Sequence, residues 1–209
     1  MTTPVLGDCL SCDDRAVKPD DARVTDVRRA DWIVDTDEPW YAVSTYGPPG
    51  LEQYARIGMA RDDEYPDEAT DARVWVDPDR ARWEAVVTVL AEFTTTPDEI
   101  HLGVWDGMGN YRTTGPYFGN AGRRYALMSG NLARALDRNT MSNDDVPNVY
   151  DAPHLAWPDD RSWVITWDTD EENNYTVGGS SEAIRAVLAI DGLRGVTVPY
   201  ATPEPGWNW

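Results

Sequence analysis

Apolar residues in this chain occur mainly in short runs that are closed by Gly, Pro, Asp or Asn. The runs at 51–57, 100–105 and 162–167 alternate between apolar and polar residues, as half-buried strands do. Further short strands are expected at 32–34, 41–43, 124–128 and 196–198. Short strands that do not alternate regularly with helices predict an α+β fold with a mixed or mostly antiparallel sheet.

Three segments are predicted to be helical. The first begins at Asp77-Pro78, where Asp is a favourable N-cap and Pro suits the first turn. A single apolar face of this helix would carry Trp83, Val86, Val87, Leu90 and Phe93. The second helix runs from about Ser181 to Ile190 and stops at Gly192, and a third is expected after a cap at Ser129. We expect these two or three helices to pack on one face of the sheet.

The chain is expected to divide into an arm, a domain and a tail. Residues 1–30 are polar and charge-dense, which predicts an N-terminal arm. Residues 31–198 carry the strands and helices of a single α+β domain, and residues 199–209 form a Pro- and Trp-rich C-terminal tail. Within the domain, the polar segment at 139–160 is expected to be a long loop.

The charge balance limits the classes of partner. The sequence has 37 acidic and 18 basic residues, a formal net charge of -19. Such a charge repels phosphate backbones, so direct nucleic-acid binding is not expected. Three interpretations stay open: an acidic surface that serves solubility, a match to a basic protein partner, and imitation of DNA.

The sequence predicts a cytoplasmic protein. Its apolar runs are all shorter than the roughly 20 residues that cross a bilayer, and no membrane association is expected. The N-terminus lacks the basic and apolar segments of a secretory signal. Two cysteines in a chain of this size do not make a disulfide framework, which agrees with a reducing compartment.

Motifs for nucleophilic or metal catalysis are missing from the sequence. It contains neither G-x-S-x-G nor H-E-x-x-H. Cys9-x-x-Cys12 offers two thiol ligands, but His101 and His154 lie too far away along the chain for a compact zinc finger. No catalytic residue, metal or cofactor is therefore predicted, and an enzyme is the less favoured alternative.

Aromatic residues gather in the second half of the chain beside a few polar groups. Such groups form ligand pockets and protein-interface anchors, and they also form ordinary cores. The candidate binding residues of this set are Trp105, Asp106, Tyr125, Trp157, Arg161 and Trp163.

Gly178, Gly179 and Ser180 connect a strand-like run to the second periodic helix. A turn of this kind can leave free N–H groups at a helix N-terminus, where a small anion or carboxylate could bind. The alternative is a simple strand-to-helix turn with a serine cap, which is the favoured interpretation. The turn lacks the lysine of a P-loop and the third glycine of a dinucleotide-binding turn.

Several segments together resemble an uncharacterised family of soluble actinobacterial proteins. They are GLEQYARI (50–57), HLGVWDGMG (101–109), RRYALMSG (123–130), HLAWPDDRSWVITWDTD (154–170) and TVGGSSEAIRAVLA (176–189). The family pattern has W-[DE]-G-x-G after a strand, then W-P-x-D-R-x-W and V-G-G-S. The resemblance covers about 48–198 and departs from the pattern in the acidic EENN insertion and the long first arm. It implies a cytoplasmic domain and no particular reaction.

The sequence favours a non-catalytic acidic protein that binds a basic protein partner, as an immunity or antitoxin-like protein does. Neutralising a basic effector requires steering charge and a hydrophobic anchor but no catalytic group. One alternative is a DNA mimic that inhibits a DNA-binding protein. Another is a small-ligand-binding domain that uses the Gly-Gly-Ser turn, with Arg161 and tryptophans as pocket walls.

Overall fold

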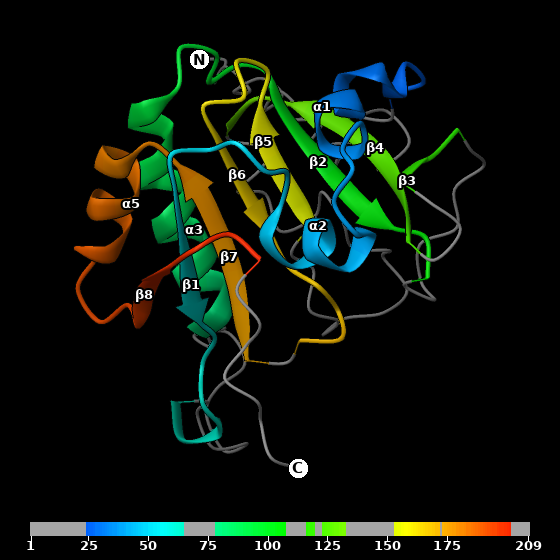
Figure 1. Ribbon diagram of the computed structural model, residues 1–209. Coiled ribbons are helices and arrows are strands. Elements are labelled where there is room, and N and C mark those ends of the chain that lie inside the picture. The colour runs from blue at the N-terminus through cyan, green and yellow to red at the C-terminus, as the bar shows by residue number, and fades with distance from the viewer. Residues whose placement is uncertain are drawn as a thin grey trace, which may run out of the picture.

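The computed structural model of the protein describes residues 24–64, 78–107, 116–119, 123–132, 153–171 and 173–201. Its centre is one eight-stranded sheet in the order β3-β4-β2-β5-β6-β7-β1-β8 (Figure 1). Each pair of neighbouring strands is antiparallel. The predicted α+β class with a mostly antiparallel sheet is therefore confirmed.

The strands are β1 (Gln53–Gly58), β2 (Ile100–Trp105), β3 (Phe118–Gly119), β4 (Arg124–Gly130), β5 (Leu155–Pro158), β6 (Trp163–Thr166), β7 (Asn174–Gly179) and β8 (Gly195–Val198). The α-helices are α1 (Asp31–Val34), α2 (Trp40–Tyr46), α3 (Pro78–Leu90) and α5 (Ser181–Leu188). The 3-10 helices within the described ranges are η2 (Val27–Ala30), η3 (Asp62–Glu64) and η4 (Ala91–Phe93). The two helices predicted from periodicity are confirmed as α3 and α5.

Strand β1 lies between two strands that come much later in the sequence. Tyr54 is opposite Gly178 of β7 on one side and opposite Val198 of β8 on the other. Strands β5, β6 and β7, in contrast, follow one another as an antiparallel meander. The C-terminal side of the sheet is thus completed by a strand from the N-terminal third of the chain.

Helices cover both faces of the sheet, and not one face as the sequence suggested. Helices α3 and α5 pack on the face that carries Trp163 and Ile165 of β6. Helices α1 and α2 contribute Ile33 and Val43 to the opposite face, together with Val164 of the same strand. In Figure 1, α1 and α2 lie in front of the sheet and α3 lies behind it. Successive side chains of β6 therefore enter two different cores.

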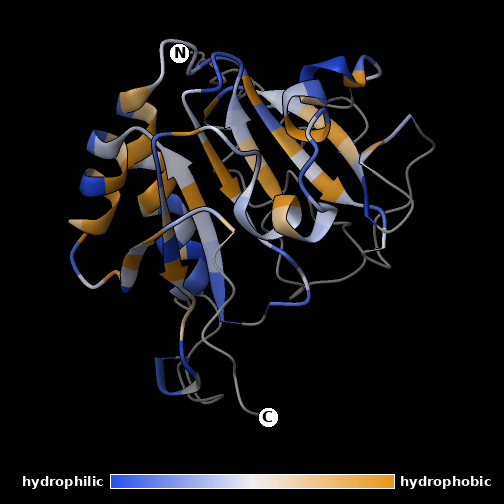
Figure 2. Ribbon diagram, viewed as in Figure 1, coloured by the Kyte–Doolittle hydropathy of each residue, from blue (hydrophilic) through white to orange (hydrophobic). Residues whose placement is uncertain are grey.

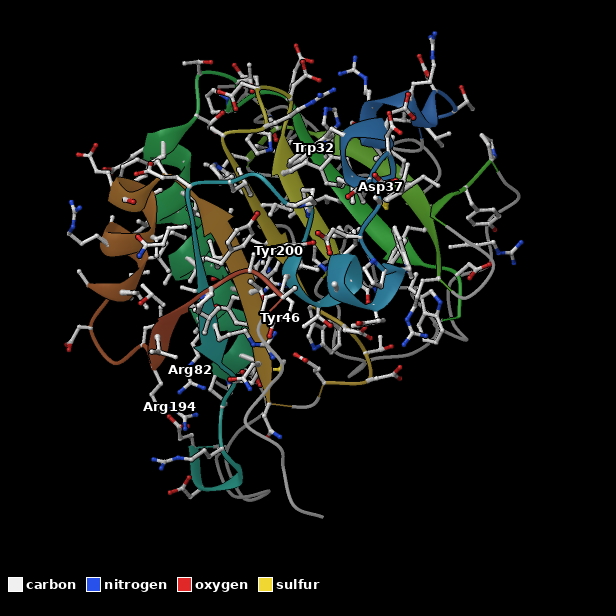
Figure 3. All side chains as sticks on the ribbon, in the orientation of Figure 1. Trp32, Asp37, Tyr46, Arg82, Arg194 and Tyr200 are labelled. Atoms are coloured by element: carbon white, nitrogen blue, oxygen red, sulfur yellow. The ribbon has the colours of Figure 1, made fainter. Side chains whose placement is uncertain are left out.

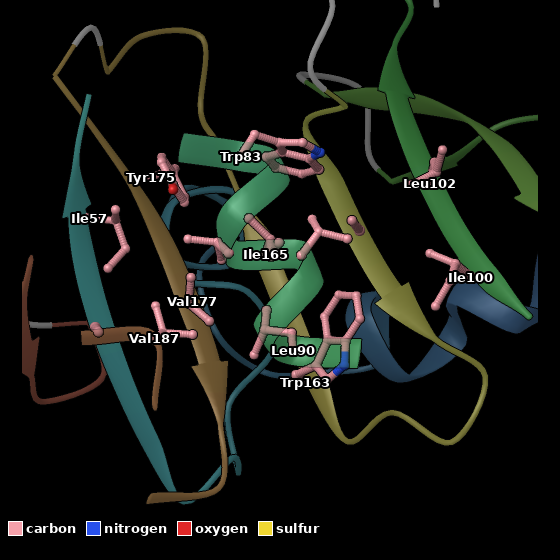
Figure 4. Packing of buried hydrophobic residues seen from close by; sticks show 14 of the residues in the cluster. Ile57, Trp83, Leu90, Ile100, Leu102, Trp163, Ile165, Tyr175, Val177 and Val187 are labelled. Atoms are coloured by element: carbon pink, nitrogen blue, oxygen red, sulfur yellow. The ribbon is translucent and has the colours of Figure 1, made fainter. Parts of the chain in front are cut away.

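The larger core lies between the sheet and α3 and α5 (Figure 4). Trp83, Val87 and Leu90 of α3 pack there against Ile57 and Val177 of the sheet. Apolar residues run along the central strands, whereas η2 at the upper right is mostly hydrophilic (Figure 2). Burial on both faces of the sheet explains why β5 and β6 are continuously buried.

Two predicted strands are wrong, because residues 32–34 and 41–43 belong to the short helices α1 and α2. Tyr41 is 74% exposed while Ala42 and Val43 are both buried, a pattern that does not have the period of a strand. Pro39 precedes α2, and Gly47 ends it at φ 80° and ψ -170°. Apolar runs this short do not distinguish a strand from a helix by periodicity.

Three further expectations are corrected by the sheet. Ser129, expected as a helix cap, lies within β4, and β5 forms inside the segment 139–160 that was expected to be a loop. Gly178 and Gly179 are the last two residues of β7 and not a turn. A Cβ on Gly178 would come within 2.7 Å of Leu51 Cδ1, so glycine here permits close packing inside the sheet.

Residues near both expected domain boundaries contact the sheet. The Val24 N–H donates to the Leu127 carbonyl at 3.0 Å, and Ala30 is buried. Near the other boundary, the Tyr200 ring lies 5.1 Å from the Tyr54 ring. Cys9 and Cys12 and the segments 1–23, 65–77, 133–152 and 202–209 lie outside the described residues.

Gly47→Ala is expected to lower the free energy of unfolding by about 2–3 kcal/mol. Gly47 has a backbone conformation that L-residues rarely adopt, and its Cβ would lie 2.9 Å from Thr166 Oγ1 and from Val164 Cγ1. Gly192→Ala is the matched control, because φ is also positive (75°) but no atom of the described residues lies within 4 Å of the added Cβ. The control should cost about 1 kcal/mol in urea unfolding followed by circular dichroism. Equal losses for the two variants would contradict the packing argument.

Candidate functional site

The candidate binding residues predicted from the sequence divide between the two ends of the sheet. Trp105 and Tyr125 are register partners at one end, and their rings lie 6.2 and 6.1 Å from the His154 ring. Trp163 and Gly179 are register partners at the other end. The predicted set therefore does not come together as one site.

Trp157 and Trp163 are both 0% exposed and belong to the cores on opposite faces. Arg161 has a positive φ of 58°, and its guanidinium lies 5.7 Å from the ring centre of Trp32. Asp106 forms an ion pair with Arg124 beside Trp105. Of these residues, only Asp106 and Arg161 present a charged group outside the cores.

The N-terminus of α5 already holds an anionic group of this chain. The Glu52 carboxylate accepts from the Ser181 N–H at 3.0 Å and from its hydroxyl at 2.7 Å. These hydrogen bonds lower the pKa of Glu52. Ser180 caps the helix by accepting from the Ala183 N–H at 3.1 Å. An external anion at this helix end would therefore meet the Glu52 carboxylate.

A polar group that we call the His101 cluster lies on the α1 face of β2. It consists of Arg29, Glu99, His101, Ser129 and Asp159. The sheet register places it: His101 is opposite Ser129 on β4 and opposite Trp157 on β5. Ile100 and Leu102 point into the α3 core, so His101 points to the other face.

Hydrogen bonds connect the His101 cluster in a fixed order. His101 Nδ1 lies 2.5 Å from Ser129 Oγ, and His101 Nε2 lies 2.9 Å from Asp159 Oδ1. Arg29 Nη1 donates to Asp159 at 2.6 Å and to Glu99 at 3.3 Å. The hydrogen bond from His101 lowers the pKa of Asp159, which is therefore ionised at neutral pH. Because a carboxylate only accepts, Nε2 carries the proton and Nδ1 accepts the Ser129 hydroxyl proton.

The His154 cluster lies at the end of the sheet where β2 ends and β5 begins. His154 Nδ1 accepts from the Trp105 N–H at 3.2 Å, and the imidazole stacks on Trp167 at 5.2 Å. His154 is 2% exposed, and its Nε2 has no hydrogen-bond partner among the described residues. Burial lowers the pKa of His154 to about 4, against the opposing effect of Asp168.

Asp168 is the buried acidic member of this cluster. It accepts from the Ser44 hydroxyl at 2.7 Å, from Arg123 at 3.1 Å and from the Asp170 N–H at 3.1 Å. Burial alone would raise the pKa of Asp168, but these hydrogen bonds and the Arg123 charge lower it overall. Asp168 is thus an ionised anchor that connects α2 to the end of β6.

A third feature, which we call the acidic segment, covers residues 31–41 and includes α1 and the start of α2. Asp31, Asp35, Asp37 and Glu38 are all exposed, and the segment contains no lysine or arginine. None of the four carboxylates forms an ion pair with another residue in the described ranges. Tyr41 is 74% exposed at its end. Figure 3 shows Asp37 beside Trp32 on this side of the molecule.

Sequence reasoning missed the His101 cluster, although it placed His101 within a strand. The error was to assign Ser129 to a helix cap, which removed it from the strand beside His101. Extending the predicted strand at 124–128 by two residues, to RYALMSG, would have placed Ser129 on a strand as well. The acidic segment was missed because its residues were assigned to two strands and a turn.

Comparison with known protein families, curated proteins and solved structures finds no match to this chain. The resemblance to actinobacterial proteins stays a prediction from the sequence. Among the helices in the described ranges, none has the length and apolar character needed to cross a bilayer.

Proposed function

We propose that this protein binds a basic protein partner through the acidic segment, as an immunity or antitoxin-like protein does. The observation that carries the proposal is the set of four exposed carboxylates without an ion pair next to the exposed Tyr41. We infer a cytoplasmic encounter, in line with the sequence.

The acidic segment differs from other acidic residues of the described surface. Arginines neutralise many of the other carboxylates, as Arg28 does for Asp26 and Arg82 does for Glu64. Glu92, Asp98, Glu182 and Asp191 also lack an ion pair within the described ranges, but they are spread along the chain. Carboxylates that lack such partners retain their field and attract a positively charged surface during diffusion. The net charge of -19 adds to this attraction over longer distances at low salt.

Tyr41 gives the acidic segment a hydrophobic anchor. Tyrosine supplies large contact area with little side-chain entropy to lose, and it is enriched at interface hot spots. Tyr41 lies in helix α2, which is fixed in place because Ser44 of the same helix donates to the buried Asp168 at 2.7 Å. The anchor is therefore presented on a fixed helix, which reduces the ordering cost of binding.

The test is affinity capture from native lysate with two matched variants. The first neutralises Asp31, Asp35, Asp37 and Glu38 to Asn or Gln, and the second neutralises Glu92, Asp98, Glu182 and Asp191 in the same way. All eight residues are exposed, and both variants change the net charge equally. We expect the first to retain at least about ten-fold less of a basic protein at low salt, and the second to retain it.

The identity and salt response of the captured protein decide between the alternatives. Capture of a basic protein supports the acidic segment as the interface if added salt releases that protein and if the Tyr41→Ala variant no longer captures it. A DNA-binding protein that duplex DNA displaces would replace this proposal with DNA mimicry. If both charge variants retained the partner equally, or if added salt did not release it, the acidic segment would not be the interface.

A further inference from the structure

The hydrogen-bonded order Ser129, His101, Asp159 matches the donor–acceptor order that activates a serine nucleophile. We propose that Ser129 is a nucleophile toward uncharged carboxylic esters, with His101 as its general base and Asp159 as the positioning residue for His101. This activity goes beyond partner binding and would make the protein more than a non-catalytic binder.

The geometry allows direct proton transfer from the serine to the imidazole. Ser129 Oγ lies 2.5 Å from His101 Nδ1, on neighbouring strands whose register places the two residues opposite each other. Asp159 fixes the other nitrogen at 2.9 Å, which keeps Nδ1 free of a proton. The nucleophile is therefore oriented by the sheet itself and does not depend on loop closure.

His101 is in the form that accepts a proton at neutral pH. Burial lowers the pKa of His101, and the hydrogen bond to Asp159 opposes this effect only in part. The side chain is 2% exposed, so bulk water does not compete for its nitrogen atoms. Ser129 itself is partly exposed, so the reacting oxygen is the accessible member of the pair.

The backbone of β4 offers a donor for the developing oxyanion. The Leu127 carbonyl accepts from Val24 on the outer edge of β4, so Leu127 directs its backbone polar groups away from β2. In an antiparallel strand the same direction recurs two residues later, at Ser129. No residue in the described ranges accepts from the Ser129 N–H. That N–H belongs to the nucleophilic residue itself, so it lies close to where the substrate carbonyl oxygen would gain negative charge once Oγ has attacked.

The surroundings of Ser129 select an uncharged substrate. Arg29 is already engaged by Asp159 and Glu99, so it does not offer a free cation to a substrate anion. The net charge of -19 further repels anionic esters.

In the first step, Ser129 Oγ forms a bond to the ester carbonyl carbon while its proton moves to His101 Nδ1. Collapse of the tetrahedral intermediate breaks the carbon–oxygen bond to the alcohol, which takes the proton from Nδ1. Water then attacks the acyl group with His101 again as the base, and this step releases the carboxylic acid and restores the Ser129 hydroxyl.

The proposed catalyst is expected to turn over slowly. The Asp159 side chain is 41% exposed, and Arg29 shares the same Oδ1 that His101 uses. Both features weaken the stabilisation that Asp159 gives to a protonated His101. A probe that reacts once and remains attached is therefore a more sensitive readout than ester turnover.

The experiment treats the full chain with a fluorophosphonate probe and locates the label by peptide mass spectrometry. We expect labelling of Ser129 and its loss in Ser129→Ala. Ser181→Ala is the matched control, because Ser181 donates its hydroxyl to Glu52 without an imidazole. Its labelling should equal that of the native protein. No label on Ser129 in the folded protein would overturn the proposal.

His101→Asn tests the general base, and its labelling is expected to be at least about a hundred-fold slower. Circular dichroism establishes whether this variant folds. If it does not fold, the pH profile of the native protein decides. A general base predicts a labelling rate that levels off above the pKa of His101, which burial places below 6.5. A rate that rises about ten-fold per pH unit without levelling, as for an unassisted hydroxyl, would overturn the proposal.

Discussion

Trp163→Ala should lower the free energy of unfolding by about 3–5 kcal/mol, because it removes a tryptophan, the largest side chain, from a fully buried core. Trp163 is 0% exposed and packs near Leu90 on the α3 face of the sheet (Figure 4). Two helices and several strands surround the side chain. They cannot all move inward to fill the cavity that alanine would leave. The expected loss is a large part of the stability of an ordinary domain.

Trp163→Phe should cost clearly less than Trp163→Ala. The Trp163 indole N–H is buried and has no hydrogen-bond partner in the part of the chain that the structure describes, so the native side chain already bears a desolvation penalty. Phenylalanine fills much of the volume and removes the unsatisfied donor. Urea unfolding followed by far-ultraviolet circular dichroism measures both variants.

Tyr41→Ala is the control for the tryptophan variants, since a 74% exposed side chain should change stability by less than about 0.5 kcal/mol. A Trp163→Ala variant within about 1 kcal/mol of the native protein would contradict the closed core. The comparison also separates structural from binding residues. Tyr41→Ala should weaken partner capture in a folded protein, whereas Trp163→Ala should weaken it only through unfolding.

Acidification from pH 6.5 to pH 4 should reduce the free energy of unfolding by about 3 kcal/mol through His154. Burial lowers the pKa of His154 to about 4 in the folded protein, whereas in the unfolded chain it returns to about 6.5. Between these values the unfolded chain binds a proton that the folded protein excludes. Stability is therefore full above pH 6.5 and falls as the pH drops toward 4, at about 1.4 kcal/mol per pKa unit.

His154→Gln should flatten this pH dependence, because the chain contains only His101 and His154. Burial also lowers the pKa of His101, so a smaller dependence of the same sign should remain in the variant. The carboxyl group of Asp160, with a pKa of about 2, loses its contribution only at lower pH. Urea midpoints between pH 5 and pH 7 measure the slope, and an unchanged slope in His154→Gln would assign the effect to other groups.

The regular elements of this fold follow from the sequence where the apolar pattern is long enough. Helix α3 has four buried apolar residues on one face, and β2 alternates over six residues. Helices α1 and α2 were assigned wrongly because runs of a few apolar residues fit both periods. Their helical form depends on the sheet face beneath them, which buries Ile33 and Val43.

The candidate sites follow from the sequence to a smaller degree. Trp105 and Tyr125 were identified as candidates by residue type, and the structure does bring them together. The pairing of His101 with Ser129 depends on the register between β2 and β4, which no local pattern encodes. Asp159 joins them through the turn after β5, a strand that the sequence did not predict.

The position of β1 also bears on how the chain reaches its native state during synthesis. Both neighbours of β1, at 174–179 and 195–198, leave the ribosome more than a hundred residues after it. Until then its two edges lack their partners, and Ala55 and Ile57 lack the strands that shield them. Such long-range pairing folds slowly and exposes a nascent chain to aggregation. Completion of this sheet therefore waits until β7 and β8 have been synthesised, and ribosome-bound chaperones have time to act on β1 before then.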